Sequence, residues 1–249
     1  MKELTTLFLL IALSASAQIP FSLRDPGARF NPGASVAVAE SATYLINQNF
    51  EGSGSGGWDN SETWTGIDLV VSNATDAILR GSYSCKLDPL TVDANAYSPA
   101  FAVQSNLFTS FRFMFSGTNT ENARAIFVVE TNTVAQLTAY LGPANVLQLK
   151  HGSDGTKAGT FSLTSNTLWY VWVDYTTNSA PGVTDGWGAI YCTNSTTKPA
   201  NPYISTTTGT ASNKIDRVRI HSDRSATCFT TNWFDQVLVD DVDIGNITP

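Results

Sequence analysis

The sequence has 249 residues and a net charge of −7, and only 14% of its residues are charged. An acidic chain lacks the basic surface that binding to phosphate backbones requires, so the composition argues against a nucleic-acid partner. The length is sufficient for one large all-β domain with its own hydrophobic core.

The first 17 residues have the pattern of a secretory signal peptide. Lys2 precedes the apolar run 7–13, and residues 14–17 end in an Ala-x-Ala pattern that predicts cleavage after Ala17. The apolar run is too short to span a bilayer, and no later segment is apolar enough to anchor the chain. We therefore expect a secreted protein without membrane insertion.

Residues 18–42 carry Pro20, Pro26 and Pro32 and few apolar residues, which predicts an N-terminal arm or linker. The folded domain is expected at 43–247. Its three cysteines, Cys85, Cys192 and Cys228, fit no zinc-binding pattern. We interpret them as small buried residues, and the sequence leaves a bridge between Cys192 and Cys228 open.

Short runs rich in Val, Ile, Phe, Tyr and Thr follow from residue 43 onward, separated by clusters of Gly, Asn, Ser and Pro. Such runs predict β-strands, and Asp154–Gly155 is the expected turn of a hairpin. About a dozen strands without helices predict two stacked antiparallel sheets. The expected strands are 43–50, 77–87, 94–103, 108–115, 123–130, 135–141, 146–150, 159–163, 168–175, 186–192, 216–221 and 234–244.

Four of these segments resemble a known family. They are 49–58 (NFEGSGSGGW), 81–87 (GSYSCKL), 168–175 (LWYVWVDY) and 234–245 (FDQVLVDDVDIG). Their order and spacing are similar to the concanavalin A-like (laminin-G-like) superfamily, which implies a two-sheet antiparallel jelly-roll sandwich. That superfamily contains lectins, carbohydrate-binding modules, adhesion domains and glycan-cleaving enzymes, so the resemblance alone does not decide the function.

The last of these segments ends in a cluster of aspartates that includes Asp240, Asp241 and Asp243. Calcium prefers several oxygen ligands, carboxylates above all. The resemblance implies a structural calcium ion between the first and last strands, held by Glu51 with Asp240 or Asp241. The alternative is that these acids keep an edge strand soluble and unpaired.

The distribution of carboxylates argues against a glycoside hydrolase. Such enzymes use two carboxyl groups on either side of one bond, whereas Glu130 and Asp174 each stand alone in the sequence. Arg217, Arg219 and His221 alternate onto one face of the strand at 216–221, where they could meet an acidic glycan or serve a polysaccharide lyase. The alternative is an ordinary solvated face.

Aromatic residues suggest a further binding surface. Trp58, Trp64 and Trp187 lie in or beside glycine-rich sequence, and exposed indoles of this kind stack on sugar rings. The alternative is that they fold back and cap the core. His151 falls in the predicted hairpin, where we expect it to be exposed to solvent.

The leading hypothesis is a secreted, non-catalytic domain that binds carbohydrate and is stabilised by calcium. A structural or adhesive surface protein with protein partners is the second hypothesis. A polysaccharide lyase or glycoside hydrolase is the third.

Overall fold

The computed structural model describes residues 44–52, 63–67, 69–72, 79–89, 93–120, 123–152, 156–207, 213–223 and 231–247. The predicted signal peptide (1–17), almost all of the sequence before the first strand, Trp58, Cys228 and the Asp154–Gly155 turn lie outside these residues. Within the described residues, no helix has the length and apolar character needed to cross a membrane.

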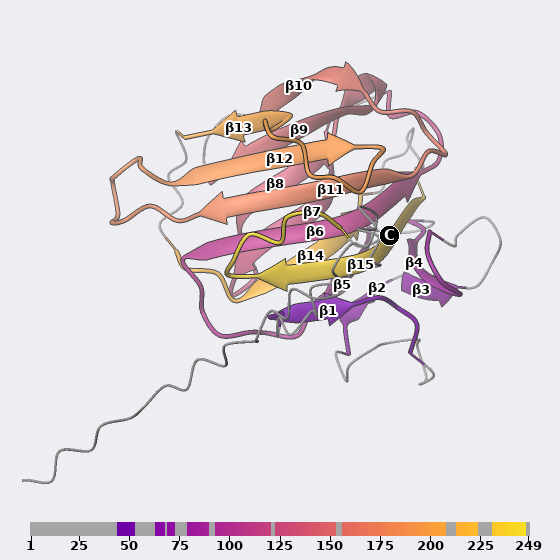
Figure 1. The fold of residues 1–249 in the computed structure, drawn as a ribbon, viewed down its shortest axis with the longest axis horizontal. Helices are drawn as coiled ribbons and strands as arrows, with labels where there is room; N and C mark the ends of the chain where they lie inside the picture. The colour runs from indigo at the N-terminus through magenta and orange to yellow at the C-terminus, as the bar shows by residue number, and fades with distance from the viewer. Residues whose placement is uncertain are drawn as a thin grey trace, which may run out of the picture. The chain divides into compact units, whose positions relative to one another are not determined.

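Two antiparallel sheets form the domain, and Figure 1 shows sheet A in front of sheet B. Sheet A has the order β13-β12-β11-β6-β15-β4-β3, and β1 also pairs with β15. Its strands are β1 (Ile46–Gln48), β3 (Leu69–Ser72), β4 (Ser84–Leu87), β6 (Asn106–Phe115), β11 (Trp169–Thr176), β12 (Trp187–Thr193), β13 (Ile204–Thr206) and β15 (Asn232–Asp240).

Sheet B has the order β10-β9-β8-β7-β14-β5-β2. Its strands are β2 (Thr65–Ile67), β5 (Ala94–Tyr97), β7 (Arg124–Thr131), β8 (Val134–Leu141), β9 (Val146–His151), β10 (Lys157–Ser162) and β14 (Arg217–Ser222). A single 3₁₀ turn, η1 (Pro143–Asn145), joins β8 to β9 among the described residues.

Aromatic side chains fill the space between the sheets. Phe111 of β6 stacks on Phe127 of β7, with ring centroids 5.0 Å apart, and Phe234 of β15 lies 5.8 Å from Phe111. All three rings are fully buried. Burying a side chain of this size contributes about 1.5–3 kcal/mol relative to leaving it in water. The alternation of apolar residues along β6, β7 and β15 therefore explains why the two sheets stack face to face.

Each of the twelve predicted strands corresponds to an observed strand, and the predicted sandwich is confirmed. The sequence prediction misses β2, β3 and β13, which have only three or four residues each, too few to display a period in the sequence. Cys85 and Cys192 are buried free thiols, and burial raises the pKa of each.

The closing strand differs from its prediction at both its middle and its end. A bulge between Asp235 and Leu238 adds one residue, and Gln236 takes up the irregularity with a φ of 47°. Phe234 and Val237 can therefore both face the core although they are three residues apart. The strand ends at Asp240, not at Ile244, and the chain continues across the outer face of sheet A, where Ile247 packs against Trp172.

Candidate functional site

The first candidate site is the outer face of sheet B around β14. Val218 and Ile220 point into the core, so Arg217, Arg219 and His221 share the opposite face. This confirms the predicted alternation. It follows from the period of two along a strand and needs no information from the rest of the chain.

The two arginines gather around an aromatic ring from the neighbouring strand β5. Arg219 is the cross-strand partner of Tyr97, and its Nη1 lies 3.3 Å from the tyrosine hydroxyl oxygen. The guanidinium carbons of Arg217 and Arg219 lie 5.8 and 5.2 Å from the Tyr97 ring centroid, which is within cation–π range. Sequence reasoning missed Tyr97 because β5 and β14 are far apart in the chain.

Glu130 of β7, the strand on the other side of β14 from β5, also contacts this arginine cluster. Its Oε1 lies 2.8 Å from Nη2 of Arg219, and its side chain is 1% exposed whereas that of Arg219 is 20% exposed. Burial raises the pKa of Glu130, and the attraction of Arg219 and Arg217 offsets this only in part. Two cations therefore face one buried carboxylate, which leaves positive charge on the solvent side of the cluster.

The same face extends along β8 and β9. Leu147 and Leu149 of β9 point into the core, so Gln148 and Lys150 face outward, and Tyr140 of β8 is the cross-strand partner of Gln148. Tyr140, Gln148 and Lys150 are all partly exposed. The alternation of Gln148 and Lys150 with buried leucines is the sequence signal that marks these two residues as outward-facing. We call Tyr97, Tyr140, Gln148, Lys150, Arg217 and Arg219 the basic face.

His221 lies at the edge of the basic face and is 7% exposed. Its Nδ1 is 3.0 Å from Oδ1 of Asp223, and Oδ2 of the same carboxylate accepts the backbone N–H of Ala125. Burial raises the pKa of Asp223, but the His221 contact and the Ala125 hydrogen bond outweigh it and the net shift is downward. Asp223 thus fixes the orientation of the His221 ring.

The structure does not bring Glu51 together with Asp240 or Asp241. In the antiparallel pairing of β1 with β15, Ile46 lies opposite Val239 and Gln48 opposite Val237. Glu51 therefore lies towards the beginning of β15, whereas Asp240 is its last residue. Asp235 lies five positions before Asp240, which corresponds to at most about 17 Å along an extended strand. The expected pairing is corrected: the acid of the closing strand that lies near Glu51 is Asp235.

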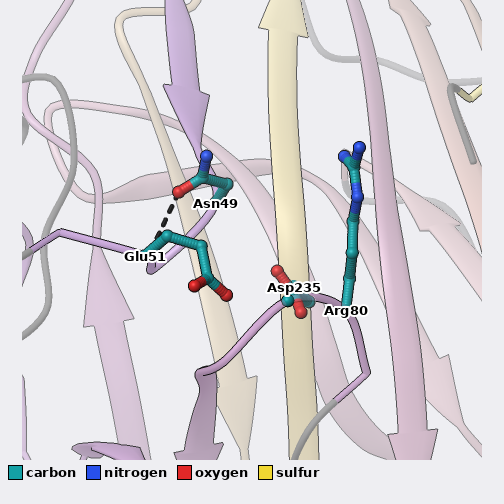
Figure 2. A pocket seen from close by; sticks show the side chains of 5 residues that line it. Asn49, Glu51, Arg80 and Asp235 are labelled. Carbon is teal, nitrogen blue, oxygen red and sulfur yellow. Dashed lines mark hydrogen bonds between the residues drawn. The ribbon is translucent and has the colours of Figure 1, made fainter.

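Asn49, Glu51, Arg80, Gly81 and Asp235 line a pocket of about 250 Å³ (Figure 2). Oε1 of Glu51 accepts the backbone N–H groups of Ser82 and Tyr83 at 2.7 and 3.0 Å. Gly81 has a φ of 64°, and a Cβ at this position would collide with the Glu51 carboxylate. The turn before β4 thus needs glycine in order to approach Glu51.

Asp235 forms the floor of this pocket and is 1% exposed. Its Oδ2 accepts a hydrogen bond from the Ser84 hydroxyl at 3.0 Å, and its Oδ1 accepts the Gln236 N–H at 2.7 Å. Burial raises the pKa of Asp235 to about 7, although both hydrogen bonds act against the shift. A buried carboxylate that is costly to ionise is a group that a bound cation would stabilise.

Two of the three tryptophans of the predicted platform, Trp64 and Trp187, lie among the described residues, and the structure places them in different clusters. Trp64 is 2% exposed and packs edge-on against Phe50, with ring centroids 6.3 Å apart, so its place in the core corrects the prediction that it contacts sugar. Trp187 is partly buried on the outer face of sheet A, against the group around Trp172. His151 is also corrected, because it is fully buried and lies edge-on to Tyr175.

The sequence matches no protein-family model and no curated protein. Among solved structures, it is similar to the receptor-binding domain of botulinum neurotoxin type G, at 11% identity and a TM-score of 0.56, covering 82% of this chain and 49% of that one. The cellulose-induced protein Cip1 is similar at 15% identity and a TM-score of 0.53, with 80% and 99% covered.

A mutant of the alginate lyase Aly36B, solved with an alginate trisaccharide, is also similar, at 10% identity and a TM-score of 0.50, with 79% of this chain and 98% of that chain covered. At such identities the likeness establishes the fold and nothing finer. The protein is an all-β, two-sheet antiparallel sandwich of jelly-roll type.

Proposed function

We propose that this protein is a secreted carbohydrate-binding domain and that its basic face binds an acidic polysaccharide. The observation that carries the proposal is the pair of arginines held against Tyr97, with Glu130 as the one buried carboxylate that the described residues place against them. The predicted signal peptide at 1–17 would deliver the domain to the extracellular space, where such polymers occur.

The chemistry of the face suits a chain of sugar acids. A guanidinium offers paired N–H donors to a carboxylate, and the flat ring of Tyr97 can pack against the C–H surface of a sugar. Lys150, two strands beyond β7, supplies a further cation along the same face. The alginate lyase of similar fold, which was solved with an alginate trisaccharide, supports this ligand class.

We further propose that a structural calcium ion binds between Glu51 and Asp235. The concanavalin A-like resemblance implies an ion between the first and last strands, and the pocket offers carboxylate and amide oxygens from Glu51, Asp235 and Asn49. These hard oxygen donors fit calcium. The ion would hold the chain after β1 against β15 and would take no part in binding sugar.

Calorimetric titration with oligomers of alginate and of polygalacturonate tests the ligand proposal, with a neutral cello-oligosaccharide as a negative control. The informative variant is Arg219→Met combined with Glu130→Gln, which removes the ion pair without leaving a buried charge. We expect its affinity for the acidic oligomers to fall about tenfold or more, the effect of losing one charge-assisted hydrogen bond. Lys86→Met, which removes a cation from β4 of sheet A, is the matched control.

Unchanged affinity in the double variant would overturn the assignment to the basic face. Release of unsaturated uronates from the polymers would assign a polysaccharide lyase instead, with His221 as the base held by Asp223. Failure to bind any glycan, together with concentration-dependent self-association, would favour the adhesive alternative.

A further inference from the structure

A second group of polar side chains occupies the edge of sheet B beside the basic face. Asn95 of β5 is the cross-strand partner of His221 of β14. Their neighbours Ala96 and Ile220 point into the core, so Asn95 and His221 face outward. Asp93 precedes Asn95 by two residues and Asp223 follows His221 by two, and the period of an extended chain directs all four side chains to the same side.

Three of these groups converge closely. One ligand atom each from Asp93, His221 and Asp223 lies within 4.8 Å of the other two. Ligand atoms that bind one ion with bonds of about 2.1 Å lie at most about 4.2 Å apart. A small rotation of one side chain would therefore bring these three ligand atoms close enough to bind the same ion. Asp93 is exposed and can make that movement, whereas His221 is buried and fixed.

Asn95 provides an independent sign that a ligand belongs here. Its side chain is 8% exposed, and its Oδ1 has no hydrogen-bond partner among the residues that the structure describes. Leaving a buried carbonyl oxygen unsatisfied costs about 1–3 kcal/mol. Directly paired residues place their Cβ atoms about 5 Å apart, so the Asn95 side chain lies next to that of His221 on this face. A cation bound between the two side chains would satisfy the Asn95 oxygen.

We propose that Asp93, Asn95, His221 and Asp223 form a site for a divalent transition-metal ion. One imidazole nitrogen and three oxygens suit Zn²⁺ or Mn²⁺ better than Ca²⁺, which prefers oxygen ligands alone. Two carboxylates give the site negative charge, which Arg124 beside Asp223 balances only in part. The site is distinct from the Glu51–Asp235 pocket on the other sheet. It is formed by residues well over a hundred positions apart, so no local motif reveals it.

The test is calorimetric titration of the chelator-treated protein with Zn²⁺ in the absence of any glycan. We expect one ion per chain and an affinity that falls at least about tenfold in Asp93→Asn, since even indirect partners of a metal site have effects of this size. Asp93 is exposed, so this variant should fold normally. His221→Ala should abolish binding and also the visible absorption bands of bound Co²⁺.

Asp241→Asn, which removes an exposed carboxylate beyond β15, and Asp235→Asn, which alters the proposed calcium pocket, are the controls and should leave Zn²⁺ binding unchanged. Absence of Zn²⁺ binding, or equal affinity in the wild type and Asp93→Asn, would overturn the proposal. Because no sugar is present in this titration, its outcome is separate from that of the carbohydrate proposal.

Discussion

Nζ of Lys198 lies 2.9 Å from Oδ2 and 3.1 Å from Oδ1 of Asp174, so that its ammonium group neutralises a carboxylate buried on the outer face of β11. The same nitrogen lies 2.7 Å from Oδ1 of Asp243, beyond the end of β15. Nearby, the Trp172 indole donates a hydrogen bond to the Gly245 carbonyl at 2.7 Å. The aspartate cluster of the sequence thus contributes one acid that fastens the C-terminal segment to sheet A.

Replacing Lys198 should destabilise the fold markedly. Asp174 has only 4% of its side chain exposed, so Lys198→Met leaves a buried carboxylate without its counter-ion. Removing one partner of a buried pair typically costs about 3–5 kcal/mol, which urea unfolding would measure. Asp243→Asn is the matched control, because its side chain is 58% exposed and an exposed pair contributes about 1 kcal/mol at most. Equal losses in the two variants would contradict the buried role of Asp174.

The difference in stability between the wild type and Lys198→Met should depend on pH. Burial raises the pKa of Asp243, but the contact with Lys198 outweighs this and lowers it overall. Its stabilising contribution is therefore present above the unfolded pKa of about 3.9 and is lost as the pH falls through the lower, folded pKa.

The pKa of Asp174 is shifted in the opposite direction to that of Asp243. Burial raises its pKa and Lys198 offsets this only in part, so the cost of ionising it disappears as the pH falls. Once both carboxyls are protonated, Lys198 has no charge to pair with. Urea unfolding between pH 7 and pH 3 should show the gap between the wild type and Lys198→Met shrinking with falling pH. A constant gap would instead assign the loss to the contact of the Lys198 ammonium with the Tyr191 ring, whose centroid lies 4.5 Å from Nζ.

Calcium should raise the melting temperature through Asp235 and not through Asp240. An ion at a hundred times its dissociation constant stabilises the native state by about 2.7 kcal/mol, which is roughly 5–10 °C for a domain of this size. We expect Asp235→Asn and Glu51→Gln to lose this shift between calcium and chelator, and Asp240→Asn to retain it. Loss of the melting-temperature shift in Asp240→Asn and its retention in Asp235→Asn would instead support an ion held by Glu51 and Asp240.

The sequence was sufficient where a structural feature depends on local periodicity. The alternation of Arg217, Arg219 and His221 with core residues is contained within six consecutive positions, and the structure has it as predicted. Tyr97 and Glu130, which complete the arginine cluster, come from β5 and β7. Their approach to Arg219 depends on strand order and register, which a single sequence does not display.

The closing strand illustrates why the carboxylate near Glu51 is that of Asp235 and not that of Asp240 or Asp241. A regular strand places Asp235 and Val237 on one face, whereas the bulge at Gln236 interrupts that alternation. Asp235 becomes a buried residue beside Ser84, and the conspicuous acids Asp240, Asp241 and Asp243 lie at the strand end or beyond it. A one-residue irregularity thus decides which carboxylate meets the first strand.

Truncating Trp64 should lower the stability of the fold more than truncating Trp187, although the sequence predicts that both contact sugar. Trp64 lies in the core against Phe50, so Trp64→Ala should cost about 3–5 kcal/mol in urea unfolding. Trp187 is only partly buried, so its truncation should cost less. Trp64→Phe keeps an aromatic ring in the core, and we expect the folded variant to bind acidic oligosaccharides with wild-type affinity. A large loss of affinity in this stable variant would mean that the indole contacts sugar after all, and that the core around Phe50 opens when the ligand binds.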